Sequence, residues 1–279
     1  MTTLVTGSRG RVGRALVDLL HTRGHAVRAA SRTPGELTLP DGVASPRLAL
    51  DEPETFPAAL EGVTSVFLYA EPSHAAAFAR AAADAGVRHI VLLSSSSVHY
   101  SDAATHPVAR PHLEAEQALA AGPVTATFLR PGVFATNALG WSRAIKATGT
   151  VDLPYPGAYS DPIHELDLAE AAFTVLTDPA RQGGAYTLSG PEALSFLDQA
   201  EQISRGTGVP VTVNPVSPEA WKEAVGPYLP GHFADALLAF WKSSDGKPGA
   251  LAGGVEELTG RPARTFATWV EDHATDFRP

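Results

Sequence analysis

The chain has 279 residues, no cysteine and a formal net charge of −9 at pH 7. The acidic balance argues against the broad basic surface that nucleic-acid binding needs, and the absence of cysteine excludes disulfides, thiolate metal sites and a cysteine nucleophile. No apolar run approaches the roughly 18 residues of a membrane span, and the chain starts with a strand rather than a charged leader. These features predict a cytoplasmic protein that binds neither nucleic acid nor membrane.

The N-terminal segment predicts a short apolar strand, a glycine turn and a helix. The turn has the pattern GxxGxxG, in which Gly7 permits the tight turn, Gly10 lets the backbone approach phosphates and Gly13 lets helix and strand pack closely. Unpaired N–H groups at the helix start would face a nucleotide pyrophosphate. The residues predicted to hold it are Gly7, Arg9, Gly10, Arg11, Val12 and Gly13.

The residues after the turn complete a strand–helix–strand unit. Apolar residues from Val12 to Leu20 recur at helical spacing, and Gly24 can end that helix. Residues 25–31 then predict a second strand. Within about thirty residues the segment supplies the context that a dinucleotide-binding fingerprint requires.

The end of the second strand indicates which dinucleotide is bound. Ser31 and Arg32 stand where an NAD-preferring site usually has an acidic residue for the ribose 2′-hydroxyl. A guanidinium can instead grip the 2′-phosphate of NADP, and Arg9 lies close enough in the chain to assist. Residues 1–32 carry a formal charge of +5, so the remainder carries −14. We therefore expect NADP(H) in preference to NAD(H).

Strands and helices alternate along the rest of the chain, which is typical of a parallel sheet covered on both faces. Further strands are predicted at residues 46–50, 63–69, 89–94, 125–129 and 185–189, and helices at 51–60, 73–85, 112–121 and 168–176. Residues 130–134 predict a rigid turn, 137–162 a loop or cap, and the last ninety residues mostly helices with a short strand near 209–213.

This order predicts an α/β fold, a Rossmann doubly wound parallel sheet with a smaller, mostly helical C-terminal region. Residues 1–150 would form the NAD(P)-binding domain, completed by elements within 160–190, and residues 191–279 a substrate-binding or cap region. Ligands bind beyond the carboxyl ends of such strands. Further cofactor contacts are therefore expected from Tyr69, Ala70, Ser94, Pro131 and Phe134.

Several segments carry a family resemblance. They include Thr6-Gly-x-x-Gly-x-x-Gly13, Ala85-Gly-Val-Arg-His-Ile-Val91, Leu129-Arg-Pro-Gly-Val-Phe134, Asp167-Leu-Ala169 and Arg264-Thr-Phe-Ala-Thr-Trp269. With these, nearly the full chain resembles the NmrA-like group of atypical short-chain dehydrogenases/reductases. That group includes NADPH-dependent quinone oxidoreductases and redox-sensing regulators. The resemblance is specific for fold and cofactor, and much less so for the reaction.

One expected catalytic feature of that superfamily is absent. Its typical members use a Tyr-x-x-x-Lys pair for proton transfer, whereas this chain has no lysine before Lys146. In many NmrA-like proteins a lysine opens the helix after the fifth strand, and His112 stands at about that place. Its imidazole could bond the nicotinamide ribose or transfer protons, and Glu116, one turn later, would raise its pKa. The alternative is an ordinary surface histidine.

Other candidates follow from position. The catalytic candidates are His112, Ser95 and Tyr100, and the substrate-binding candidates are Ser96, His99, Asn137 and Trp141. The two serines could bond a substrate carbonyl or merely cap a loop, and Trp141 could cover an aromatic substrate or pack in the core. Trp221, Trp241 and Trp269 are interpreted as core or interface residues. No His-x-x-x-His or comparable cluster appears, so no metal site is predicted.

The sequence thus predicts an NADPH-dependent reductase of a small hydrophobic carbonyl, quinone or conjugated aromatic or polyketide-type substrate, acting as a monomer or homodimer. The loss of the Tyr/Lys pair keeps a second hypothesis open, a non-catalytic NADP(H)-sensing regulator that acts through a protein partner. Abundant Ala, Gly, Pro and Arg with few Lys is typical of a GC-rich bacterial gene.

Overall fold

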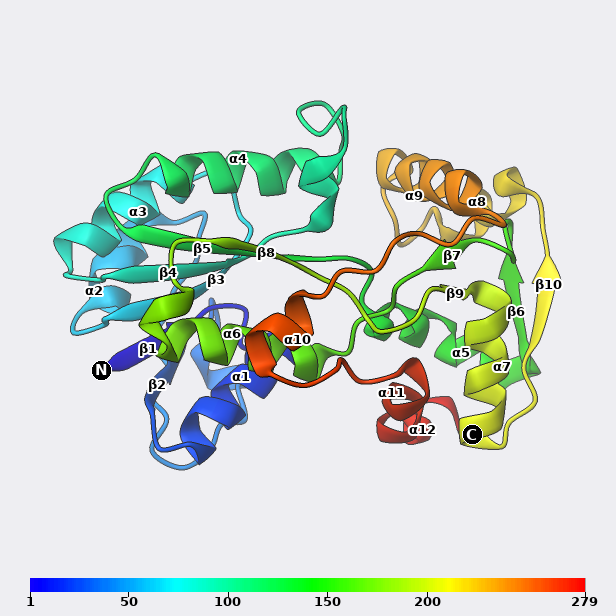
Figure 1. The fold of residues 1–279 in the computed structure, drawn as a ribbon, viewed down its shortest axis with the longest axis horizontal. Coiled ribbons are helices and arrows are strands. Elements are labelled where there is room, and N and C mark those ends of the chain that lie inside the picture. Colours follow the sequence, from blue (N-terminus) through cyan, green and yellow to red (C-terminus); the bar gives the residue numbers. More distant parts are fainter. Residues whose placement is uncertain (279) are drawn as a thin grey trace.

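A six-stranded parallel sheet forms the centre of the larger of two lobes (Figure 1). The computed structural model describes residues 1–278. The strand order is β2-β1-β3-β4-β5-β8. Successive strands are therefore added on one side of β1 and then, from β3 onward, on its other side. The strands are β1 (Thr2–Val5), β2 (Ala26–Ala29), β3 (Ser65–Tyr69), β4 (His89–Leu93), β5 (Thr125–Pro131) and β8 (Ala185–Leu188). This order confirms the predicted Rossmann architecture.

Helices cover both faces of the sheet, as the continuous apolar strands require. In β4, Val91 packs on one face, whereas Ile90 and Leu92 pack on the other, and all three are fully buried. One face carries α1 (Arg11–Thr22), α6 (Glu165–Thr177) and α10 (Gly254–Thr259). The other carries α2 (Phe56–Leu60), α3 (Ala75–Asp84) and α4 (Ala109–Ala120).

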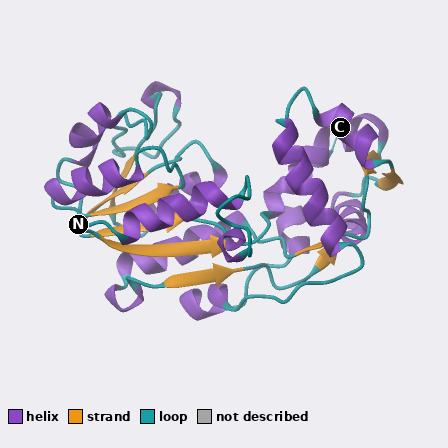
Figure 2. Cartoon of the chain, turned by 90° about the horizontal axis from the view of Figure 1, so that it is seen from above, coloured by secondary structure: helices purple, strands orange, loops and turns teal. Residues whose placement is uncertain are grey.

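The smaller lobe stands beyond the carboxyl ends of the strands and is mostly helical (Figure 2). Its core surrounds Trp269 and draws on residues from 135 to 277. Its helices are α5 (Ser142–Thr148), α7 (Phe196–Thr207), α8 (Pro218–Val225), α9 (Gly231–Ser244), α11 (Phe266–Asp272) and α12 (Ala274–Phe277). Its strands pair as β6 (Thr150–Leu153) with β10 (Thr212–Pro215), and β7 (Tyr159–Ser160) with β9 (Leu194–Ser195). Short 3-10 helices lie at Pro34–Glu36, Pro53–Thr55, Ser96–His99, Ala135–Trp141 and Pro179–Arg181.

The chain passes between the lobes more than once. Residues 135–160 pack with the C-terminal helices, α6 and β8 then return to the sheet, and α10 returns to it again after the smaller lobe has been built. The facing sides of the two lobes are therefore formed by segments that are far apart in the sequence.

Three predicted elements differ from the structure. The strand predicted at residues 46–50 forms only an isolated bridge between Ser31 and Arg47, because Pro46 has no N–H to continue a ladder. The loop predicted at 137–162 contains α5, β6 and β7, whose apolar residues pack against helices distant in sequence. The helix predicted from His112 begins at Ala109, since Pro111 is tolerated in a first turn. No helix within residues 1–278 is long and apolar enough to cross a membrane.

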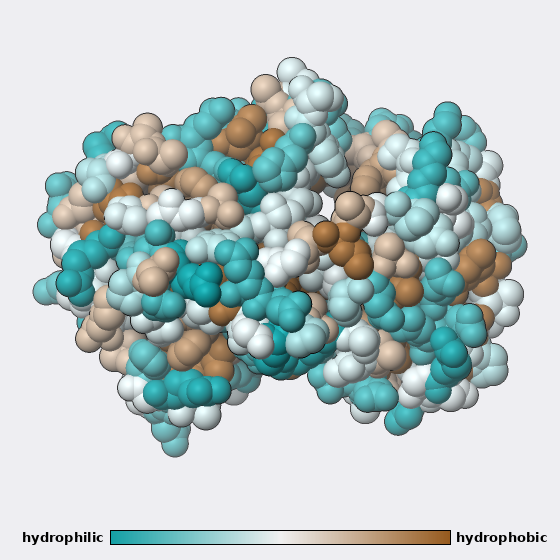
Figure 3. Space-filling model, in the orientation of Figure 1, coloured by the Kyte–Doolittle hydropathy of each residue, from teal (hydrophilic) through white to brown (hydrophobic). Residues whose placement is uncertain are grey.

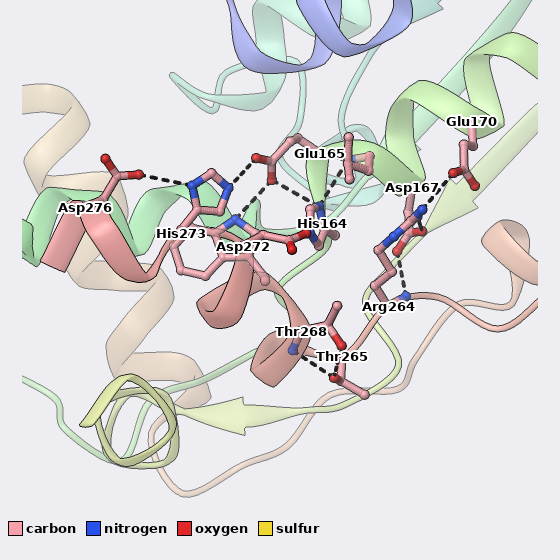
Figure 4. A network of polar contacts seen from close by, with 12 residues as sticks. His164, Glu165, Asp167, Glu170, Arg264, Thr265, Thr268, Asp272, His273 and Asp276 are labelled. Atoms are coloured by element: carbon pink, nitrogen blue, oxygen red, sulfur yellow. Dashed lines mark hydrogen bonds and ion pairs between the residues drawn. The ribbon is translucent and has the colours of Figure 1, made fainter. Parts of the chain in front are cut away.

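A buried polar network joins the start of α6 to α11 and the residues around it (Figure 4). Glu165 accepts hydrogen bonds from Trp269 Nε1 at 3.0 Å and from His273 Nε2 at 2.6 Å. Burial opposes its ionisation, but bonds from His164 and His273 lower the pKa of Glu165 to about 2. Asp167, fully buried, pairs with the Arg264 guanidinium and accepts the Arg264 backbone N–H at 2.7 Å.

Candidate cofactor and substrate site

The glycine turn between β1 and α1 has the geometry that its sequence predicts. Gly7 adopts φ +63°, and its carbonyl accepts the Gly10 N–H at 2.8 Å. A Cβ on Gly13 would overlap the Gly7 carbonyl oxygen and lie 2.8 Å from its carbonyl carbon. Gly10 caps α1 without a side-chain hydrogen bond, so the helix start is free to receive an anion. This cradle fits a nucleotide pyrophosphate.

A cavity of about 300 Å³ lies beside this turn. Ser31 and Arg32 line it from the end of β2, and Arg9 from the glycine turn. Both guanidiniums are held by carboxylates: Arg32 bonds Asp51 at 2.5 Å and Glu52 at 3.1 Å, and Arg9 bonds Glu36 at 2.7 Å. Arg32 is still 55% exposed, so its outer N–H groups remain accessible to a ligand.

A second cavity of about 1240 Å³ lies between the lobes, and the space-filling view shows the surface hollowed there (Figure 3). Tyr69, at the end of β3, lines both cavities. The two cavities therefore adjoin at this residue. This is the arrangement expected when a dinucleotide extends along the carboxyl edge of the sheet toward a substrate pocket.

The larger cavity brings together most of the predicted cofactor-end and substrate residues. Those that line it are Tyr69, Ala70, Ser94, Ser95, Ser96, Tyr100, His112, Pro131, Phe134, Asn137 and Trp141. His99 is exposed and does not line it, because the 3-10 turn after β4 directs that residue outward. Gly10, Arg11, Val12 and Gly13 shape the turn and line neither cavity.

Ser94, Ser95 and Ser97, which follow β4, are engaged within the protein. Ser94 donates to Glu116 at 2.5 Å. Ser95 accepts the Ser97 N–H at 3.2 Å and the Ser97 hydroxyl at 2.9 Å, which is the loop-capping alternative that its position allowed. Their hydroxyls thus hold the loop in place beneath the cavity.

His112 lies in α4 and faces the cavity with a buried Nδ1 that has no hydrogen-bond partner in the described structure. Burial lowers its pKa, and the nearby Glu116 opposes that shift without reversing it. Glu116 thus acts in the expected direction, but burial outweighs it, and the pKa of His112 is lowered overall. The charge of Glu116 is itself balanced by Arg130, whose Nε and Nη2 donate to the carboxylate at 3.0 and 2.6 Å. Burial therefore favours the uncharged imidazole.

Several residues of the cavity were not among the sequence candidates. Trp221 and Trp241 line it, although they were interpreted as core or interface residues; Trp269, by contrast, is fully buried in the core. Asp161 also lines it, beside the turn at Gly132. Its position between Pro-rich segments gave no periodic signal, and its proximity to Gly132 depends on contacts between the end of β5 and the end of β7.

Known proteins resemble this chain over its full length. Residues 7–179 match the family described as NAD(P)H-binding. A (4-alkanoyl-5-oxo-2,5-dihydrofuran-3-yl)methyl phosphate reductase from Streptomyces griseus is 36% identical over 99% of both chains. An NAD(P)H azoreductase from Xenophilus azovorans is 32% identical over 98% of both. The structure of an NADPH-dependent quinone oxidoreductase from Escherichia coli, 25% identical, covers 97% of this chain and 98% of its own with a TM-score of 0.80.

Proposed function

Since this chain belongs to the NAD(P)H-binding family, and to its NmrA-like short-chain dehydrogenases/reductases, we propose that it is an NADPH-dependent reductase of a small hydrophobic carbonyl, quinone or conjugated aromatic compound. One observation carries the proposal: the cavity beside the cofactor cradle adjoins, at Tyr69, a large cavity walled by aromatic residues. A regulator that only senses the cofactor has no need of such a cavity.

The residues present fit the cofactor. Gly7, Gly10 and Gly13 leave room for the pyrophosphate at the start of α1, and Arg9 and Arg32 would hold the 2′-phosphate that distinguishes NADPH from NADH. When bound, NADPH supplies a hydride. The protein then has to position the substrate, exclude water and manage protons.

His112 is the residue best placed to manage a proton. The chain lacks the Tyr-x-x-x-Lys pair, and Tyr100 is unsuited to ionise because burial, with the charge of Asp161, raises its pKa. The buried Nδ1 of His112 needs a partner, which a substrate oxygen or a ribose hydroxyl would provide. We assign it the role of bonding the substrate oxygen and delivering a proton to it.

The His112→Ala variant tests this assignment. We expect kcat/KM for the reduction of menadione by NADPH to fall by about 100-fold, the ordinary contribution of a general acid. Because burial lowers the pKa of His112, the wild-type rate should rise as the pH falls toward that pKa, and the variant should lose the rise. Stopped-flow absorbance of NADPH measures both.

His21→Ala, on an exposed part of α1, serves as the control and should keep the wild-type profile. An unchanged rate in His112→Ala would contradict the assignment. If the wild type oxidises NADPH with no quinone, aldehyde or aromatic acceptor while binding it tightly, the reductase proposal fails and the regulator hypothesis takes its place.

The Arg32→Asp variant tests the preference for NADPH. We expect the Kd for NADPH to rise by at least about tenfold, because a carboxylate would face the 2′-phosphate, while the Kd for NADH changes by less than about threefold. Titration of cofactor fluorescence measures both constants. Arg23→Asp makes the same charge change at an exposed site in the same basic segment and should leave both nearly unchanged. Equal weakening of the two cofactors by Arg32→Asp would refute the assigned phosphate site.

A further inference from the structure

The larger cavity lacks positive side chains. Of the residues within 1–278 that line it, none is a lysine or an arginine. The side chains there that titrate or carry charge are Tyr69, Tyr100, His106, His112, Asp152 and Asp161. Asp152 is exposed at the edge and accepts a hydrogen bond from Asn214 at 2.7 Å, so Asp161 is the carboxylate that faces the interior. The cavity is therefore suited to a neutral or positive ligand and unsuited to an anion.

Asp161 is held beside the cofactor end of the cavity. It follows β7 and accepts the Val133 backbone N–H at 3.3 Å. It lies so close to the turn after β5 that a Cβ on Gly132 would meet its Oδ1 at 2.6 Å. No Lys, Arg or His among the described residues comes within 4.0 Å of its carboxylate. Burial raises the pKa of Asp161, the cost of a carboxylate without a positive partner.

Aromatic rings line the far side of the same cavity. Trp241 contacts Trp221 edge-on at 4.8 Å between ring centroids and Phe196 at 5.3 Å, and Phe196 contacts Trp141 at 5.5 Å. All four rings line the cavity. Tryptophan faces attract delocalised cations more strongly than other aromatic side chains do, particularly away from water.

We propose that the site takes a cationic aromatic substrate with a delocalised iminium charge, such as an N-alkylated heteroarene. Asp161 is the counter-ion and the tryptophans are the stacking surface. This inference rests on the proposed reductase function and adds a substrate class to it, one whose reduction, unlike that of a quinone, needs no proton from His112. It also gives a chemical reason for the missing Tyr-x-x-x-Lys pair, because the reduction of such a cation consumes no proton.

The step balances without an acid. The hydride forms a C–H bond at the electrophilic ring carbon, the π electrons of the C=N⁺ bond move onto nitrogen as a lone pair, and the substrate becomes neutral. The positive charge passes to the oxidised nicotinamide, and no proton is taken up or released. Neutral product also loses its attraction to Asp161, which favours its release.

The experiment compares three probes that share one ring system: the N-methylacridinium cation, neutral acridine and acridine-carboxylate. Binding is measured at pH 7.5 by quenching of tryptophan fluorescence, both with and without NADP⁺. We expect the wild type to bind the cation at least about tenfold more tightly than acridine, and the carboxylate most weakly. NADPH-dependent reduction of the cation, corrected for the uncatalysed rate, should be saturable.

Asp161→Asn keeps the size of the side chain and removes its charge. We expect the preference for the cation over acridine to fall below about threefold while the binding of acridine and NADPH stays within about twofold. Asp84→Asn, an exposed site at the end of α3, is the matched control and should keep the wild-type preference.

The pH dependence supplies a second readout, because the charge of N-methylacridinium does not change with pH. The affinity of the wild type for N-methylacridinium should fall as the pH drops through the raised pKa of Asp161. The Asp161→Asn variant should not show this fall. Any dependence that remains in the variant belongs to the other groups facing the cavity, His106 and His112, or to Asp102 near Tyr100.

Two outcomes overturn the inference. Wild-type protein that binds the cation no better than acridine refutes it without reference to any variant. Equal loss of affinity for both probes in Asp161→Asn shows a structural role for the carboxylate. If the wild type reduces menadione in either case, the proposed reductase function stands. If no acceptor supports NADPH oxidation, that function fails, although charge-selective binding could still be observed.

Discussion

Replacing Gly13 with valine is expected to raise the Kd for NADPH by at least about 100-fold, which corresponds to about 2.7 kcal/mol of binding free energy. A side chain at this position meets the Gly7 carbonyl group, which belongs to the backbone of the turn and cannot rotate away. The turn and the start of α1 would separate, so the N–H groups there would no longer converge on the pyrophosphate. Titration of cofactor fluorescence measures the change.

Two further variants separate this effect from a general loss of folding. Gly10→Ala adds a Cβ whose nearest neighbour is the Gly7 oxygen at 3.2 Å, so it should preserve the helix and still weaken the binding of NADPH by obstructing the approach of the phosphates. Gly35→Ala, where no atom lies within 4 Å of the added Cβ, should bind NADPH like the wild type. Binding by Gly13→Val within about threefold of the wild type would contradict the assigned cradle.

Trp269→Ala is expected to cause the largest loss of stability, about 3–5 kcal/mol. The side chain is fully buried, stacks on Phe266 at 5.2 Å and donates to Glu165 at the start of α6. Its removal leaves a void in the core of the smaller lobe and takes one hydrogen-bond donor from a buried carboxylate. A melting temperature lower by roughly 10 °C, measured by calorimetry, is the expected result.

Trp221→Ala is the matched control, because it removes the same side chain from the wall of the cavity, where Trp221 is only partly buried. It should change the melting temperature by no more than about 3 °C and should raise the KM for aromatic acceptors. If the two variants melted at the same temperature, the distinction between a core tryptophan and a cavity tryptophan would be wrong.

The difference between these tryptophans illustrates what the sequence leaves open. All three C-terminal tryptophans lie in or beside amphipathic helices, so periodicity alone assigns each to a buried face. Whether that face meets another helix or an open cavity depends on elements contributed from elsewhere. Trp269 meets Phe277 and the start of α6, whereas Trp221 and Trp241 meet each other across the gap between α8 and α9.

His112 shows the same limit in its electrostatics. The spacing of Glu116 on the same helix predicts a raised pKa, but the pairing of Glu116 with Arg130 on β5 weakens that effect and burial reverses it. Arg130 lies on β5 and not on the helix of Glu116, so helical spacing does not indicate this pairing. A pKa depends on all neighbouring groups and on solvent access, so it is a property of the folded molecule.

The parallel sheet, the glycine cradle and the basic residues at the end of β2 could be predicted from the sequence alone, because each is marked by a pattern among neighbouring residues. The steric limits at Gly7 and Gly13 act within one turn, and the apolar runs are properties of single strands. Both can be recognised before the fold is known. The substrate cavity, by contrast, could not be predicted in this way. His112, Asp161 and Trp221 are separated by 49 and 60 residues along the chain, and they converge because burying Trp269 and its neighbours closes the smaller lobe over the carboxyl edge of the sheet.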